Sequence, residues 1–372
     1  MRRTYLQKHR QWFFQLLVLA AMAGVVWFVA YQVKLRLEAQ NISTGFGFLW
    51  DRAGFDLGES LISYDGDDSY GRALLAGFSN TIKVAFSSII AALLLGFLAA
   101  AAMLSGHAVA KTVASLYIRL IRNTPLLLQL FFWFGVFTIS MPAPRDTIQI
   151  FPHVYVSNRG IYFPAPDQTL TILILVVAVG LLALLPAARA LQRRRIPSEI
   201  LCPIAAIAIC MSIPVSLWVG WAGAELPQAG RFSITGGGAI SPEFLTVFVG
   251  LSIYTSTYIA ETVRGAVEAI SKGQSEAAAA LGMRKGQTLR LVVLPQATRI
   301  AMPSIVSELL NLVKNSSLGV AVGYPELVSA GNTAMNQTGQ AIELIAIYML
   351  FYVSINIVIT KLSHILEARY EW

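Results

Sequence analysis

Glu308 lies inside a largely apolar run and is the first residue to consider for binding chemistry. At about 100° per helical residue, it shares one face with other polar side chains. These are Ser304, Ser307, Asn311 and Asn315, and the opposite face offers Ile305, Leu309, Leu312 and Val313. A carboxylate at membrane depth is costly unless it is hydrated or paired, so this face must meet water or protein. The pattern predicts either a path for a polar solute or a hydrogen-bonded helix interface.

Other polar groups lie in or beside apolar runs. Lys314 stands at the edge of the same face, where it could neutralise a carboxylate or reach the membrane surface. The run 244–260 and its end supply Tyr254, Thr257, Tyr258 and Glu261, which could line a path or hold helices together. Arg119 and Arg122 are expected at the cytoplasmic end of the run 118–140, either as membrane anchors or in contact with an anionic group.

Several kinds of chemistry are not indicated. The four histidines have no metal-ligand spacing, so we predict no metal. Cys202 and Cys210 would lie about 12 Å apart on a helix, too far for a disulfide. No segment matches the phosphate-binding pattern G-x-x-x-x-G-K-[ST], and no set of acids or nucleophiles suggests a catalytic centre. We therefore expect a chain that is not an enzyme.

The elements that would hold these residues are membrane spans. Hydrophobic residues make up 56% of the 372 residues and charged residues 13%, with a mean hydropathy of +0.62, as expected for a chain dissolved in lipid. Although the net charge is +8, the Lys and Arg residues separate apolar runs, which argues against nucleic-acid binding. We predict an all-α membrane protein with about eight spans. They are expected near 12–33, 82–104, 118–140, 169–188, 200–221, 244–260, 301–320 and 342–362.

The distribution of positive charge predicts which ends of the spans face the cytoplasm. With the N-terminus inside, the inside segments collect most of the Lys and Arg residues, so both termini are expected in the cytoplasm; Lys34 and Arg36 argue weakly against this. The first run ends without the small residues of a cleavage site, and we interpret it as a retained span. The outside segments 34–70, 142–168 and 222–243 are expected to be loops with turns. Residues 72–81 are amphipathic and are expected to lie on the outer surface before the chain turns inward near Ile82.

The inside segment 261–300 predicts a short, smooth helix. We expect Ser275 to cap it, Glu276 to favour its positive end and Gly282 to end it, with small alanines between. Such a helix could enter a partner's groove or simply lie on the lipid headgroups. A second helix is expected to begin near Thr288 and to lead through Pro295 back to the membrane.

The spacing in this segment resembles that of the permease subunits of ATP-binding-cassette importers. Their loop motif reads E-A-A, three residues, G, nine residues and I-x-L-P. This chain has Glu276, Ala277, Ala278, Gly282, Leu294 and Pro295 in that register, with Val292 in place of Ile. Three further segments resemble the polar amino-acid branch of the family, namely 122–127, 258–265 and 314–318. The likeness covers about 72–140 and 244–368 and is greatest for the Q-type permease of general L-amino-acid importers.

The resemblance implies a type I importer permease core with an extra N-terminal span and a two-span insertion. The divisions would be 1–71, 72–141, 142–243 and 244–372. It also implies that residues 276–282 dock on a separate ATPase subunit, which would hold ATP and Mg²⁺. The other implied partners are a second, homologous permease, with a heterodimer expected, and a periplasmic binding protein. The cargo would be L-amino acids of broad range, and the location the bacterial inner membrane.

Three other classes of protein remain as alternatives. An amino-acid transporter driven by an ion gradient would favour paired broken helices in two related halves and carboxylates near the membrane centre. Glu308 is the only carboxylate that we expect deep in a span, and the sequence halves show no symmetry. A membrane enzyme lacks a convergent set of residues, and a membrane scaffold would give no reason for the spacing over 276–295.

Overall fold

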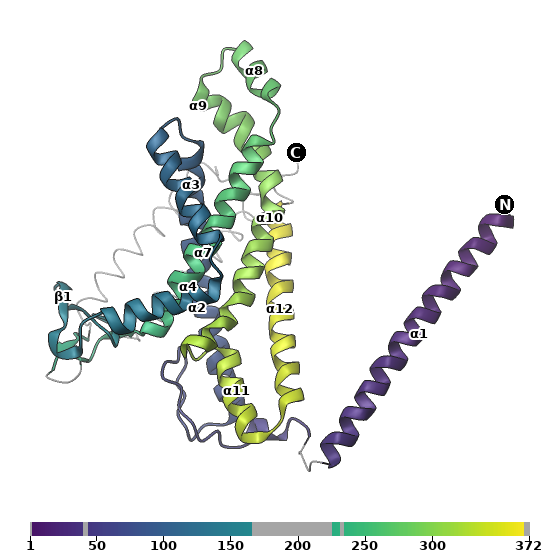
Figure 1. Ribbon diagram of the computed structural model, residues 1–372, viewed down its shortest axis with the longest axis vertical. Coiled ribbons are helices and arrows are strands. Elements are labelled where there is room, and N and C mark those ends of the chain that lie inside the picture. Colours follow the sequence, from purple (N-terminus) through teal and green to yellow (C-terminus); the bar gives the residue numbers. More distant parts are fainter. Residues whose placement is uncertain (1, 40–43, 166–224, 231–233, 368–372) are drawn as a thin grey trace, which may run out of the picture. The chain divides into compact units, whose positions relative to one another are not determined.

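The computed structural model describes residues 2–39, 44–165, 225–230 and 234–367. The described chain is mostly helical and forms two compact units, a first of residues 1–83 and 325–372 and a second of residues 84–324. The helices are α1 Arg2–Ala39, α2 Tyr70–Leu104, α3 Ala108–Arg122, α4 Leu126–Gly135, α7 Pro242–Glu268, α8 Lys272–Ala280, α9 Lys285–Thr288, α10 Leu294–Asn315, α11 Leu327–Thr338 and α12 Ala341–Glu367 (Figure 1). The strands are β1 Ile148–Phe151, β2 Val154–Ser157, β3 Gly160–Phe163, β4 Gln228–Ala229, β5 Ile234–Thr235 and β6 Gly238–Ile240.

Long apolar helices confirm the prediction of a helical membrane protein. Within the described residues, Tyr70–Leu104, Pro242–Glu268 and Ala341–Lys361 are long and apolar enough to cross a membrane. The pair α3 and α4 would make a fourth if it counts as one span. The predicted spans 169–188 and 200–221 lie outside the described residues, so the number eight stays a prediction. Helix α2 runs unbroken from Tyr70, so the inward turn expected near Ile82 is wrong.

The first unit contains a packed outer segment where the sequence predicted a loop. Phe48, Tyr70, Leu74, Leu327 and Phe351 are buried in one cluster that joins this segment to α2, α11 and α12. The side chain of Asn80, itself fully buried, connects three backbone segments. Its Nδ2 donates to the carbonyl oxygens of Glu59 at 2.8 Å and Pro325 at 2.9 Å, and its Oδ1 accepts from the Leu61 amide at 3.1 Å. The region 44–69 is therefore fixed to the helices.

Glu326 caps α11 from a fully buried position. Its carboxylate accepts hydrogen bonds from the backbone amides of Val328 at 2.9 Å and Ser329 at 2.8 Å. These bonds favour the charged form, but burial outweighs them and raises the pKa of Glu326 to about 8. Glu326 lies outside the long apolar helices.

We expect the thermal stability of the protein in detergent to fall as the pH rises from about 4.5 to about 8. A carboxyl group whose pKa is higher in the folded state than in the unfolded state favours folding at low pH. That contribution is lost as the pH rises through about 8. A Glu326→Gln variant, which cannot ionise, should show a flatter profile, whereas Asp67→Asn, at an exposed carboxylate, should keep the wild-type slope. An unchanged slope in Glu326→Gln would show that Glu326 does not titrate in this range.

Helix α7 organises the second unit. Ser241 caps it, since its Oγ accepts a hydrogen bond from the Phe244 amide at 3.0 Å, and Pro242 occupies the first turn, where a missing N–H costs nothing. Along its length α7 packs against α3, α4 and α10. At Gly250 a Cβ atom would stand 2.5 Å from Cδ2 of Leu130, so the absent side chain lets α4 approach α7 closely.

Two of the predicted outside loops contain strands. The strands β1, β2, β3 and β6 form an antiparallel sheet in that order, and β4 pairs with β5. The expectation of turns alone in 142–168 and 222–243 is therefore wrong. The β-branched and aromatic residues of 154–156 and 161–163 favour a pleated surface, and Gly160 lies between the two strands. The many prolines in this segment obscured that signal.

Candidate functional site

A sharp bend interrupts the predicted span 118–140. Helix α3 ends at Arg122, α4 begins at Leu126, and the two axes differ by 102°. The prediction of one continuous span is therefore wrong. The cause lies in Pro125, which has no N–H to donate, and in Thr124, since a residue before proline is disfavoured in the helical conformation. Arg119 and Arg122 consequently lie in the last turn of α3, at the bend.

Gln129 holds the bend together and was missed in the sequence. Its buried amide Nε2 donates to the carbonyl oxygen of Thr124 at 3.0 Å, and to that of Ile121 at 2.9 Å, which also accepts from the Thr124 amide at 3.3 Å. The available signal was one amide in an otherwise apolar stretch, 126–132, directly after a proline.

A Gln129→Met variant should lower the thermal stability of the protein and reduce its activity. Methionine has a similar length but no donor, so the carbonyl oxygens of Ile121 and Thr124 each lose a hydrogen bond, and each such bond contributes about 0.5–1.5 kcal/mol. The exposed neighbour Leu128→Met serves as the control and should behave like the wild-type protein. Thermal unfolding in detergent measures the difference, and equal melting temperatures for the two variants would contradict this role for Gln129.

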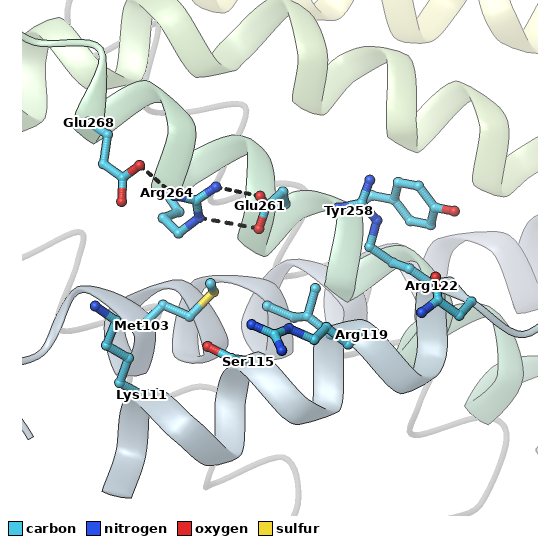
Figure 2. A pocket seen from close by; sticks show the side chains of 11 residues that line it. Met103, Lys111, Ser115, Arg119, Arg122, Tyr258, Glu261, Arg264 and Glu268 are labelled. Atoms are coloured by element: carbon cyan, nitrogen blue, oxygen red, sulfur yellow. Dashed lines mark hydrogen bonds and ion pairs between the residues drawn. The ribbon is translucent and has the colours of Figure 1, made fainter. Parts of the chain in front are cut away.

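The bend forms one end of a polar cleft between α3 and α7 (Figure 2). The cleft has a volume of about 480 Å³. Its lining residues are Met103, Lys111, Ser115, Ile118, Arg119, Arg122, Asn123, Tyr258, Glu261, Arg264 and Glu268. The chain direction of α3 is opposite to that of α7, so Arg122 lies near Tyr258 at one end and Lys111 near Glu268 at the other.

Positive charge predominates in this cleft. On the α7 wall, Arg264 forms ion pairs with Glu261 and Glu268, and its Nε lies 3.3 Å from Oε2 of Glu261. These three side chains together carry one negative charge. The α3 wall carries three positive charges, on Lys111, Arg119 and Arg122. The cleft can therefore attract an anionic group such as a carboxylate.

At the end beside the bend, the cleft meets polar side chains that were predicted from the sequence. The Arg122 guanidinium stacks on Tyr258, with Cζ 4.9 Å from the ring centroid, and the hydroxyls of Tyr258 and Tyr254 are 3.0 Å apart. Arg122 also lies within electrostatic range of Glu308 on α10. The structure thus brings together five predicted residues, which are Arg122, Tyr254, Tyr258, Glu261 and Glu308.

Other predicted path residues lie elsewhere. Thr257 is fully buried, and its hydroxyl donates to the Tyr254 carbonyl in the same helix at 2.7 Å. On α10 the polar Ser304, Ser307 and Asn311 are exposed, while the opposite residues Ile305, Leu312 and Val313 are buried against the chain. Lys314 and Asn315 end this helix. The polar face of α10 is therefore free to meet another molecule.

The alanine-rich helix of the inside segment is α8, at one end of the second unit (Figure 1). It begins at Lys272 with Ser271 in the capping position, so the expectation that Ser275 caps it is wrong, and Glu276 lies in its middle. Ala278 is buried, whereas Glu276 and Ala277 are exposed. Leu281, at the end of the helix, is 82% exposed. This leucine was not among the residues predicted from the sequence, although an apolar side chain beside a helix-ending glycine is a usable signal.

Gly282 ends α8 in the left-handed conformation, with φ of 78°. The Gly282 amide donates to the Ala279 carbonyl at 2.9 Å, and the Met283 amide donates to the Ala278 carbonyl at 3.1 Å. This pair of bonds satisfies the last carbonyl groups of the helix and reverses the chain direction. The shape of the helix end therefore depends on the backbone freedom of Gly282.

The return to α10 begins at Lys285, three residues before the expected Thr288. A π-helical turn, residues 289–293, comes directly before Leu294 and Pro295, which open α10. Pro295 cannot donate to an earlier carbonyl, and its ring would clash with the preceding turn of a regular helix. The wider turn accommodates it and keeps α9 connected to α10.

Comparisons with known proteins agree on one family. Residues 92–372 match the model for the binding-protein-dependent transport system inner membrane component. The chain is 39% identical to the general L-amino acid transport system permease protein AapQ of Rhizobium johnstonii, over 98% of this chain and 93% of that protein. It is 36% identical to the putative amino-acid permease YhdX of Escherichia coli, over 97% and 94%. It is 34% identical to the glutamate/glutamine/aspartate/asparagine permease BztB of Rhodobacter capsulatus, over 94% and 90%.

Proposed function

The chain belongs to the family of binding-protein-dependent transport system inner membrane components, and from this premise we propose how its residues move amino acids. It is a permease subunit of an ATP-binding-cassette importer for amino acids. We propose a broad range of L-amino acids as cargo, in line with the name of the relative from Rhizobium johnstonii.

The exposed helix α8 is the observation that carries the mechanism. It follows α7 after only residues 269–271, and the chain then passes through α9 into α10. A force applied to α8 would therefore be transmitted to α7, which lines the cleft, and to α10, which bears Glu308. ATPase subunits would bind α8 through contacts with Glu276 and Leu281. ATP and Mg²⁺ would be bound on those subunits, and this chain would contribute no catalytic group.

The cleft between α3 and α7 is proposed as the release side of the path. A zwitterionic amino acid carries a carboxylate, which Arg122 and Arg119 would attract, and an ammonium group, which Glu308 would attract. Because Arg122 already stacks on Tyr258, its guanidinium is held in place before the substrate arrives. The positive α3 wall then leads the carboxylate toward Lys111 and the cytoplasm.

The remaining partners and the orientation follow from the same arrangement. With α8 facing the cytoplasmic ATPase, both termini would lie in the cytoplasm of a bacterium, and the outer segments would face a periplasmic binding protein. The exposed polar face of α10 would contact a second, homologous permease, and we propose that this partner is unlike the present chain. The divisions 1–71, 72–141, 142–243 and 244–372 stand as proposed functional segments.

Uptake by the reconstituted complex tests this function. Proteoliposomes that contain the chain, its partner permease and the ATPase should accumulate labelled amino acids only when the binding protein is outside and ATP is inside. A panel of acidic, basic and neutral amino acids would define the range. Uptake driven by an imposed ion gradient without ATP would instead establish the ion-gradient-driven alternative.

A further inference from the structure

The hairpin of β1 and β2 presents apolar side chains to its surroundings. All four residues of β1 are exposed, including Ile148 at 55%, Ile150 at 57% and Phe151 at 67%. In the four-stranded sheet β1 is an edge, and no strand among the described residues pairs with its outer side. Its free backbone groups and apolar side chains offer a surface suited to another polypeptide. We call residues 148–153 the β1 tip.

The turn of this hairpin holds an uncommon backbone conformation. His153 has a positive φ of 61°, and it is the one residue other than glycine with such a value in the described chain. It follows Pro152, whose ring fixes the preceding part of the turn. The register between β1 and β2 also shifts between Gln149 and Phe151, which bends the strand. The backbone therefore holds Phe151 in an outward position at some conformational cost.

The rest of the sheet attaches the β1 tip firmly to α7. Strand β3 pairs with β6, with Ile161 opposite Ile240, and β6 leads through Ser241 directly into α7. Gly160 passes so close to β6 that an added Cβ would stand 2.2 Å from the Ile240 carbonyl oxygen. The β1 tip is therefore fixed to a hydrogen-bonded sheet that leads into the beginning of α7.

The β1 tip and α8 lie at opposite ends of the second unit (Figure 1). Helix α7 separates them with 27 residues, a length of about 40 Å, which exceeds the hydrocarbon thickness of a membrane. If α8 meets the ATPase in the cytoplasm, the β1 tip must lie outside the cell membrane. There an exposed apolar strand edge faces water, where apolar surface of this kind marks a contact with another protein.

We propose that the β1 tip is a docking surface for the substrate-binding protein of this transport system. This inference rests on the proposed function, and the matching family is by description dependent on a binding protein. Contact would occur through the apolar side chains of Ile150 and Phe151 and through the free edge of β1. Because the sheet continues into α7, docking would act on the N-terminal end of α7. The proposed ATPase contact at α8 would act on the C-terminal end of the same helix.

ATP hydrolysis by the complete complex in nanodiscs, titrated with the binding protein, tests the proposal. Ile150→Asp and Phe151→Asp should each raise the half-maximal concentration of binding protein at least tenfold. The maximal rate at saturation and the basal rate without binding protein should stay unchanged, which also shows that the variants fold and assemble. Leu61→Asp, at an outer residue that is 59% exposed in the first unit, is the matched control and should titrate like the wild-type complex.

A photo-crosslinking amino acid at position 150 identifies what touches the strand. A product with the binding protein supports the proposal, whereas a product only with the partner permease, with another segment of this chain or with lipid overturns it. Unchanged titration of both Asp variants, or an equal shift in Leu61→Asp, also overturns it. If the binding protein does not stimulate even the wild-type complex, the proposed import function fails instead.

Discussion

A Gly282→Ala variant is expected to lose most transport-coupled ATP hydrolysis and amino-acid uptake, although it should still insert into the membrane and assemble. Gly282 has a φ of 78°, which is unfavourable for alanine by about 1–2 kcal/mol. Relief of that strain would undo the hydrogen bonds that the amides of Gly282 and Met283 donate to the end of α8. The Leu281 side chain would then change its orientation, and its proposed contact with the ATPase would be lost. We expect at least a tenfold fall in coupled hydrolysis.

Two further variants separate backbone conformation from side-chain bulk. Neither Gly282 nor Gly286 has any atom within 4 Å of an added Cβ, but only Gly282 has a positive φ. Gly286→Ala should therefore remain fully active. Asparagine tolerates the left-handed conformation better than other side chains, so Gly282→Asn should retain more activity than Gly282→Ala. Normal uptake by a Gly282→Asp protein would refute the coupling role of this helix end.

An Arg122→Gln variant should reduce the rate of amino-acid uptake at least tenfold at saturating binding protein. The side chain loses the charge that would attract the substrate carboxylate, and it no longer stacks on Tyr258. Arg122→Lys should recover only part of the rate, because lysine keeps the charge but lacks the planar group. The binding-protein concentration that gives half-maximal uptake should not change, since Arg122 lies in the cleft and not on an outer segment.

Arg52 provides the control for this experiment. Its side chain is 70% exposed and pairs with Asp67 at the surface, so Arg52→Gln should leave uptake unchanged. We also expect Glu308→Gln to lower the uptake rate, because it removes the partner proposed for the substrate ammonium group. Wild-type uptake in both Arg122→Gln and Glu308→Gln would place the substrate path elsewhere.

Hydropathy and spacing predicted the class of fold and where several helices lie, because both depend on local composition. The polar and apolar faces of 304–315 were predicted correctly, since helical periodicity alone determines them. The bend at Arg122 was missed because the apolar content of 118–140 indicates length and not direction. Gln129 became meaningful only when its amide was seen to reach Ile121 and Thr124.

The errors near α8 and in the hairpin have similar causes. Ser271 and Ser275 are both acceptable caps by residue type, so the residue preference at the cap does not distinguish which one begins the helix. Prolines around 142–166 indicated turns, while the strands between them depend on pairing with the distant residues 238–240. Long-range pairing of this kind leaves little local signal in a sequence.

Gln129 ties both arms of the bend between α3 and α4 to one buried amide. Changing the 102° angle would break the two hydrogen bonds that the Gln129 amide donates to the carbonyl oxygens of Ile121 and Thr124. The bend between α3 and α4 should therefore be rigid. A tilt of α3 would then move the far end of α4 with it, so that in the proposed substrate path one side would close and the other would widen in a single rotation.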